Sequence, residues 1–252
     1  MVPIFWVFFI GKIYLLWYNF NGDKMKQLER LSLVVGKDNI SKINNKTVLI
    51  IGLGGVGSYA LEAIVRSGVN RLVIIDKDII DITNLNRQLM TNHNNIGQYK
   101  TDVWEERIKS INPLCEVIKI TEYITPDNID LLFKYDIDYV IDACDSIPTK
   151  KELIRQCIKR KIKFIASMGM GNKVDPTRLK IMDIRKTNYD PLARMIRKMV
   201  KDERIKEKIM VVCSDELPIK NDSNVIGSTS FVPATSGLMC ASYVINDIIK
   251  EK

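Results

Sequence analysis

The sequence has one histidine and five cysteines, and both shortages exclude whole classes of chemistry. With His93 as the sole histidine, a Ser-His-Asp or Cys-His hydrolase is not expected, and a histidine-rich metal site is impossible. No two cysteines form the C-x-x-C pair that is typical of structural zinc sites. Free cysteines are mostly inert core residues, so Cys213, the one candidate for a nucleophile, is expected to be a buried strand residue. Catalysis is therefore expected to depend on carboxylates, cations and a metal ion.

The alternation of short apolar runs with helical patterns predicts an α/β fold. The chain has 252 residues, 46% of them hydrophobic, which is enough for one sizeable core. The expected helices span residues 58–67, 100–112, 127–133, 148–160 and 237–249. This order favours a Rossmann-like, doubly wound, mainly parallel sheet with an extra C-terminal β/α portion. The polar stretch 220–229 is expected to be a loop.

A glycine-rich turn follows the first expected strand, residues 48–51. Its glycines Gly52, Gly54 and Gly57 match the pattern G-x-G-x-x-G. The first permits a tight turn, the second lets the backbone approach a phosphate, and the third lets the next helix pack closely. That helix points its N-terminal amides at the anion. A second strand delivers Asp76 at the position expected for a ribose-binding acid, so the motif predicts a nucleotide site.

Two cations after this motif distinguish the site from that of a dehydrogenase. Arg87 lies in the segment Asn84-Leu85-Asn86-Arg87-Gln88, and Lys100 follows it. Attack on the α-phosphate of ATP builds negative charge on the phosphates, which fixed cations and a metal ion stabilise. Hydride transfer has no such need. The alternatives are a surface ion pair of Arg87 with Asp78 or Asp81, and a solvated first helical turn for Lys100.

A carboxylate pair follows a third expected strand, residues 139–141. Asp142 and Asp145 then lie at the carboxyl edge of the sheet, where open α/β sheets bind ligands. Mg²⁺ prefers hard oxygen ligands and takes one or two carboxylates beside nucleotide phosphates. We expect Asp145 to be the metal ligand, while Asp142 could instead cap the following helix.

Together these motifs resemble the ThiF-type, ubiquitin-activating-like adenylation family. The resemblance implies that ATP is bound by Gly52, Gly54, Gly55, Gly57, Asp76, Asn84, Asn86, Arg87, Gln88 and Lys100. In the family the matching residues bind the ribose through Asp76, the phosphates through Arg87 and Lys100, and the metal through Asp145. Arg30 matches an arginine that reaches the phosphates, often from the partner subunit, which implies a homodimer. Arg30, Arg87, Lys100 and Asp145 are thus the expected catalytic residues. For Asn84 and Asn86, plain turn chemistry remains an alternative.

Further motifs in the second half resemble the tRNA threonylcarbamoyladenosine dehydratases within that family. They span residues 166–177, 186–187, 190–192, 214–216 and 231–233, and the whole resemblance covers roughly 27–250. It implies an ATP-dependent cyclisation of threonylcarbamoyladenosine in tRNA. The alternative is adenylation of the C-terminal glycine of a ubiquitin-like sulfur-carrier protein. The missing C-x-x-C pairs weaken that alternative, although a sulfur-relay protein remains a partner to consider.

Positive charge is concentrated in the second half of the chain. Residues 147–220 contain 20 Lys/Arg and 9 Asp/Glu, whereas the whole chain has a net charge of only +8. A basic part on a nearly neutral nucleotide domain suits a polyanion such as tRNA, and a solvated helix face is the alternative. The candidate contacts are Lys150, Lys151, Arg155, Lys159, Arg160, Lys161, Lys163, Arg194, Arg197 and Lys198.

The first 24 residues do not fit the rest of the chain. Residues 2–20 are nearly all apolar and come close to the length needed to span a bilayer. They are either a membrane anchor or an extension of the gene model upstream of a start at Met25. We expect an adenylation domain over 25–252, with a basic substrate-binding part at about 147–220. A cytoplasmic location follows, with membrane contact only if the extension is real.

Overall fold

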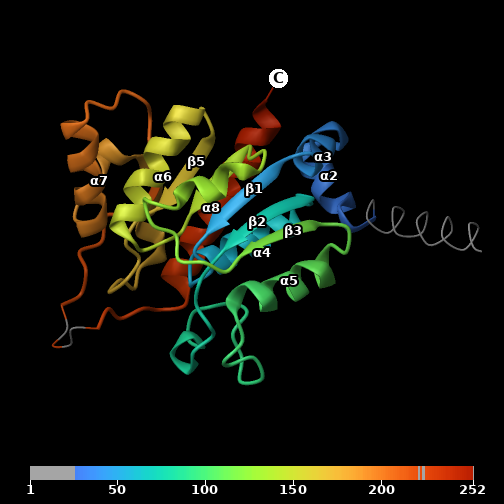
Figure 1. Cartoon of the computed structure of the whole chain (residues 1–252), viewed down its shortest axis with the longest axis horizontal. Coiled ribbons are helices and arrows are strands. Elements are labelled where there is room, and N and C mark those ends of the chain that lie inside the picture. The colour runs from blue at the N-terminus through green and yellow to red at the C-terminus, as the bar shows by residue number, and fades with distance from the viewer. Residues whose placement is uncertain (1–25, 221, 223–224, 252) are drawn as a thin grey trace, which may run out of the picture.

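The computed structural model describes residues 26–220, 222 and 225–251 (Figure 1). The apolar segment 1–24, with its two interpretations, lies outside these residues. Within the described ranges, no helix is long and apolar enough to cross a membrane.

A seven-stranded sheet forms the centre of the molecule. The strands are β1 (Thr47–Ile51), β2 (Arg71–Ile75), β3 (Glu116–Ile120), β4 (Tyr139–Asp142), β5 (Lys163–Ser167), β6 (Leu179–Asp183) and β7 (Met210–Ser214). Their order is β3-β2-β1-β4-β5-β7-β6. Every neighbouring pair is parallel except β6 with β7. The expected Rossmann-like, doubly wound sheet is confirmed, and β6 and β7 belong to the expected C-terminal β/α portion.

Helices cover both faces of this sheet. They are α2 (Glu29–Val35), α3 (Lys37–Asn44), α4 (Gly57–Arg66), α5 (Lys100–Ile111), α6 (Ile147–Arg160), α7 (Pro191–Asp202) and α8 (Phe231–Lys250). Successive residues of β1 face opposite sides: Val48 and Ile50 join the core that contains α4, α5 and α8, whereas Leu49 and Ile51 join the core beneath α6. All five β1 residues are buried, as is usual for a parallel strand between two helical layers.

Two expected helices differ from those observed. Residues 127–133 were expected to be α-helical, but the chain forms a 3₁₀ helix at Ile129–Lys134. Asn128 accepts a hydrogen bond from the Thr125 backbone and donates one to Tyr123, and such local bonds compete with a regular α-helix. Helix α8 begins at Phe231, six residues before the expected start at Gly237.

Gly237 allows α8 to pack closely against α4 (Figure 1). A Cβ atom at this position would stand 2.2 Å from the Val56 carbonyl oxygen. The glycine therefore lies inside the helix because two helices meet there, and it does not mark a helix boundary.

Candidate active site

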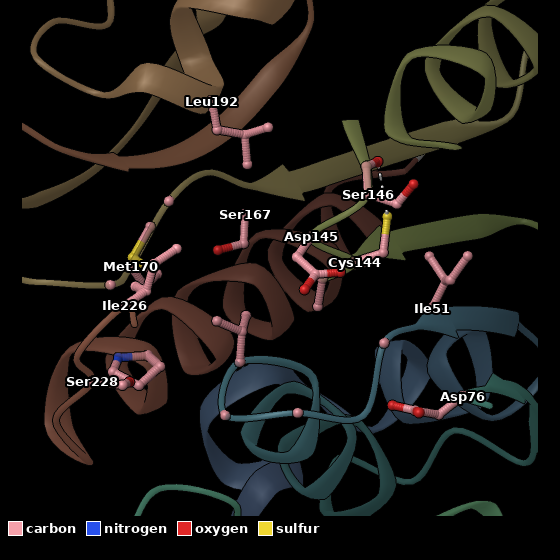
Figure 2. Close-up of a pocket in the computed structure, with 18 of the residues that line it drawn as sticks. Ile51, Asp76, Cys144, Asp145, Ser146, Ser167, Met170, Leu192, Ile226 and Ser228 are labelled. Carbon is pink, nitrogen blue, oxygen red and sulfur yellow. Dashed lines mark hydrogen bonds between the residues drawn. The ribbon is translucent and has the colours of Figure 1, made fainter. Parts of the chain in front are cut away.

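A cavity of about 940 Å³ lies at the carboxyl edge of the sheet. Its walls come from the glycine loop, the end of β2, the loop after β4, the loop after β5, the start of α7 and the segment before α8. In Figure 2, Asp76 lies on one side, Leu192, Met170 and Ile226 lie on the other, and Asp145 and Ser167 lie between them. A volume at the upper end of the range for small-molecule sites (~300–1,000 Å³) leaves room for more than a nucleotide.

The glycine loop is shaped by contacts that only glycine permits. Gly52 has a φ of +85°, and a Cβ there would stand 2.7 Å from the Ala143 carbonyl oxygen. A Cβ on Gly57 would stand 1.7 Å from the Gly52 carbonyl oxygen, so α4 packs directly on the turn. At Gly54 the nearest atom, Nε2 of Gln88, would be 3.8 Å away. The chain itself thus leaves Gly54 open, on the wall of the cavity.

Gly57→Ala and Gly54→Ala should therefore fail in different ways. The Gly57→Ala methyl group collides with backbone, so it should lower the melting temperature and weaken ATP binding together. The Gly54→Ala methyl group clashes with no protein atom, since its nearest neighbour is Gln88 Nε2 at 3.8 Å, but it would occupy the space expected for a phosphate. Only ATP affinity should therefore fall, by about tenfold or more. Thermal melting and calorimetric titration with ATP measure the two effects. Equal melting temperatures for both variants would contradict this account of Gly57.

Asp76 and Lys100 form a buried polar cluster at the end of β2. Asp76 Oδ2 accepts a hydrogen bond from the Leu53 backbone at 2.7 Å, and Oδ1 accepts one from the Asp78 backbone at 2.8 Å. Lys100 Nζ lies 2.9 Å from Asp78 Oδ2 and 3.7 Å from Asp76 Oδ2. Lys100 begins α5 but is buried, so the solvated-turn alternative is wrong. Burial alone would raise the pKa of Asp78, but hydrogen bonds from Lys77 and Lys100 hold it below its usual value.

Arg87 is held in place by neutral groups. Its guanidinium donates to the Thr83 carbonyl and to Asn86 Oδ1, each at 2.8 Å. Asn86 in turn donates to the Ser228 carbonyl at 2.9 Å, which ties this segment to the residues before α8. Arg87 forms no ion pair within the described part of the chain, so its charge remains available to an anion in the cavity.

The two other polar residues of this segment differ in role. Asn84 lines the cavity, and its Oδ1 also accepts a hydrogen bond from the Asp81 backbone that closes the short 3₁₀ helix Ile82–Asn84. Gln88 is buried, lines the cavity beside Gly54, and its Oε1 has no hydrogen-bond partner among the described residues. A buried amide oxygen without a partner is costly, so Gln88 is suited to a donor from a bound ligand.

Asp142 and Asp145, three residues apart, have opposite environments. Asp142 is 1% exposed, and its Oδ1 lies 2.8 Å from the fully buried Nζ of Lys150. The same oxygen accepts a hydrogen bond from the Cys144 backbone at 3.1 Å. Ser146 caps α6, so the interpretation of Asp142 as the helix cap is wrong: the cap position lies four residues later. Asp145 is exposed, lines the cavity and has no hydrogen bond or ion pair with the described residues.

The position of Lys150 corrects one candidate tRNA contact. Lysine is seldom buried, so the sequence placed Lys150 on a basic surface. Burial alone would lower the pKa of Lys150, but the nearby Asp142 carboxylate raises it above its usual value. The cation is therefore an internal partner of Asp142, and it cannot reach tRNA.

The far wall of the cavity contains candidates to which sequence reasoning gave no individual role: Ser167, Met170 and Leu192 lie within the motifs 166–177 and 190–192, and Ile226 lies in the expected loop 220–229. Ser167 ends β5, and Met170, Leu192 and Ile226 come from three separate loops or helix starts. Asp190 caps α7 by accepting from the Ala193 backbone, and it pairs with the buried Lys173 at 3.1 Å. In the sequence, the pair Asp190-Pro191 indicates the start of a helix at this wall.

Two other predicted residues lie away from the cavity. Arg30 is exposed on α2 and does not line it. Cys213 is a buried residue of β7, as expected, and burial raises its pKa to about 12, which leaves it a poor nucleophile.

Comparisons with known proteins agree with this geometry. Residues 26–251 match the ThiF family. The tRNA threonylcarbamoyladenosine dehydratase of Bacillus subtilis is 42% identical over 244 residues, which cover 90% of this chain and 96% of the relative. The sulfur carrier protein adenylyltransferase of Thermus thermophilus is 31% identical but matches 46% of this chain.

Solved structures extend the likeness to the whole fold. Crystal structures of the E. coli tRNA N6-threonylcarbamoyladenosine dehydratase in complex with AMP and with ATP superpose with a TM-score of 0.84 at 32% identity. They cover 89% of this chain and 94% of the other. The sequence comparison and the structure comparison therefore show the same family. The chain belongs to the ThiF family and, within it, to the tRNA threonylcarbamoyladenosine dehydratases.

Proposed function

We propose that this chain catalyses the ATP-dependent dehydration of N6-threonylcarbamoyladenosine in tRNA, in the cytoplasm. One observation carries the proposal: a single cavity joins the glycine loop and Asp76 to the wall formed by Ser167, Met170 and Leu192. ATP and a second reactant can thus meet in one space. Full-length similarity to dehydratases, against half-length similarity to a sulfur-carrier adenylyltransferase, favours tRNA as that reactant.

The reaction consists of two displacements. A carboxylate oxygen of the threonyl group bonds to the α-phosphorus of ATP, and pyrophosphate leaves. An amide nitrogen or oxygen of the same modified base then bonds to the activated carboxyl carbon, and AMP leaves with the former carboxylate oxygen. The sum is the loss of one water from the base at the expense of ATP. The protein's contribution is positioning and charge stabilisation.

The residues of the cavity suit these steps. Asp76 is placed to accept hydrogen bonds from the ribose, and Gly54 leaves space for the phosphates. Arg87 offers a cation with no acidic partner in the part of the chain that the structure describes, and Lys100 adds a second cation on the same wall. Both would oppose the negative charge that develops as pyrophosphate departs.

Asp145 fits the role of a Mg²⁺ ligand. Its carboxylate is exposed to the cavity and forms no ion pair within residues 26–220, 222 and 225–251, whereas that of Asp142 pairs with Lys150. One carboxylate beside nucleotide phosphates is a usual donor set for Mg²⁺. A bound Mg²⁺ would neutralise charge on the phosphates.

The decisive experiment is direct. Protein, ATP, Mg²⁺ and tRNA carrying the modified base are incubated, and the nucleosides are analysed by mass spectrometry. We expect an ATP-dependent loss of one water from the modified base. If pyrophosphate exchange instead required a carrier protein ending in Gly-Gly and ignored tRNA, the chain would be a sulfur-carrier adenylyltransferase, and a sulfur-relay partner would follow.

Arg30 tests whether the active site is shared between two copies. Because Arg30 lies outside its own cavity, we propose a homodimer in which it reaches the partner's ATP across a twofold interface. Arg30→Ala and Arg87→Ala should each be nearly inactive. A mixture of the two should recover part of the activity, because one hybrid site keeps both arginines. Turnover is measured after mass spectrometry has verified subunit exchange; a mixture that stays inactive would reject the shared site.

A further inference from the structure

Helix α7 carries a row of cations that form no ion pair with any of the residues described by the structure. Its buried side consists of Ala193, Ile196, Met199 and Val200. Arg194, Lys198 and Lys201 are exposed at spacings of four and three residues, which places them in one row along the helix. Within the described part of the chain, none of these three side chains forms a hydrogen bond or an ion pair. Seven residues of α-helix give the row a length of about 10 Å.

Helix α6 lies beside α7 (Figure 1). Most of the cationic side chains of α6 form ion pairs with acids. Arg155 pairs with Glu203 at 2.6 Å and with Glu152 at 2.8 Å, and Arg160 pairs with Asp130 at 2.6 Å. Lys159, in the last turn of α6, and Lys161, its C-cap residue, are exposed. Since α6 runs from the end of β4 to the start of β5, these two lie at the edge of the sheet away from the cavity.

The α7 row, in contrast, starts at the cavity. Arg194 lines it together with Leu192 and Met195. Leu192, Met170 and Ile226 all line the cavity, so the wall beside the row contains apolar side chains (Figure 2). An apolar wall accepts a flat base, and a base inside a nucleic acid must leave its stack to reach a buried site. Cations immediately outside such a wall would meet the phosphates of the same strand.

From this placement we infer that Arg194, Lys198 and Lys201 form the surface that holds the tRNA backbone beside the target base. The inference rests on the proposed function, and it selects the α7 row among the many cations of residues 147–220. It assigns to Arg194 the phosphate nearest the cavity mouth, and to Lys198 and Lys201 the phosphates further along the strand.

A pair of charge-matched variants tests the row. Arg194→Gln/Lys198→Gln removes two unpaired cations, and Arg155→Gln/Arg160→Gln removes two that are already paired with acids. The affinity for modified tRNA is measured by fluorescence anisotropy at several KCl concentrations. For the α7 variant we expect affinity to fall by about tenfold or more at low salt, and the slope of log K against log[salt] to decrease by about 2. The α6 variant should keep the wild-type slope.

Each outcome bears on the inference. If both variants lost the same tRNA affinity, binding would depend only on the net charge of the protein. If the α7 variant kept the wild-type salt slope, the α7 row would contact no phosphate. Either result would contradict the inference. For Lys201→Gln, whose side chain lies outside the cavity, calorimetric ATP affinity should stay at the wild-type value. If the α7 variant melts early, Lys201→Gln, far from the cavity, should still reduce the slope by about 1. If the wild-type protein bound no tRNA, both this inference and the proposed function would be wrong. If the wild-type protein were active but the α7 variant bound tRNA as the wild type does, only this inference would be wrong.

Discussion

Asp145→Asn should lower kcat by about 10²-fold or more while ATP binding falls much less. The carboxylate is exposed to the cavity and has no partner among the described residues, so its loss leaves the fold intact. Asparagine keeps the shape but removes the charge that would hold Mg²⁺ against the phosphates. An interaction that matters mainly as pyrophosphate departs affects kcat rather than binding, because under the proposed function Asp76 and the glycine loop would still hold ATP.

Single-turnover formation of AMP and calorimetric ATP titration at several Mg²⁺ concentrations measure this result. Asp136→Asn is a suitable control, because Asp136 is an exposed acid in the loop before β4 and lies outside the cavity. The control should match wild type in both assays. Wild-type turnover by Asp145→Asn at saturating Mg²⁺ would contradict the metal assignment and weaken the adenylation mechanism with it.

The part of the site that local sequence determines was predictable. The turn at Gly52, the close packing at Gly57 and the position of Asp76 all follow from one strand–turn–helix unit, whose geometry repeats wherever this spacing occurs. The parallel direction of the first strands was also predictable. Apolar runs that alternate with helices are compatible with few topologies, and most of these have parallel strands.

Features that depend on contacts between distant segments were not predictable. Met170, Leu192 and Ile226 form one wall, yet they are 22 and 34 residues apart and share no periodic pattern. Lys150 looked like a surface lysine because the apolar pattern of α6 does not reveal that Asp142 lies beneath it. Gly237 looked like a helix boundary because the approach of α4 is a property of the packed molecule. In each case a contact between distant segments, and not the local sequence pattern, determines where the residue lies.

Lys150→Met should cost about 3–5 kcal/mol of unfolding free energy, the range for removing one partner of a buried ion pair. The Asp142 carboxylate, which is 1% exposed, would then lack its countercharge, and its Oδ2 already has no hydrogen-bond partner among the described residues. Urea unfolding followed by circular dichroism measures the loss. A matched control is Lys151→Met, the adjacent and only half-buried lysine of α6, which should change stability by less than about 1 kcal/mol.

Removing both charges of the Asp142–Lys150 pair distinguishes its contribution to stability from its contribution to the position of Asp145. In Asp142→Leu/Lys150→Met, apolar groups of similar volume replace both ions, and such replacements are often neutral or stabilising. The double variant should therefore regain most of the stability that Lys150→Met loses. It should not regain turnover, because Asp142 Oδ1 also accepts the Cys144 backbone hydrogen bond that shapes the loop carrying Asp145. A stable double variant with wild-type kcat would show that the buried pair does not position Asp145, and that its contribution is confined to the stability of the fold.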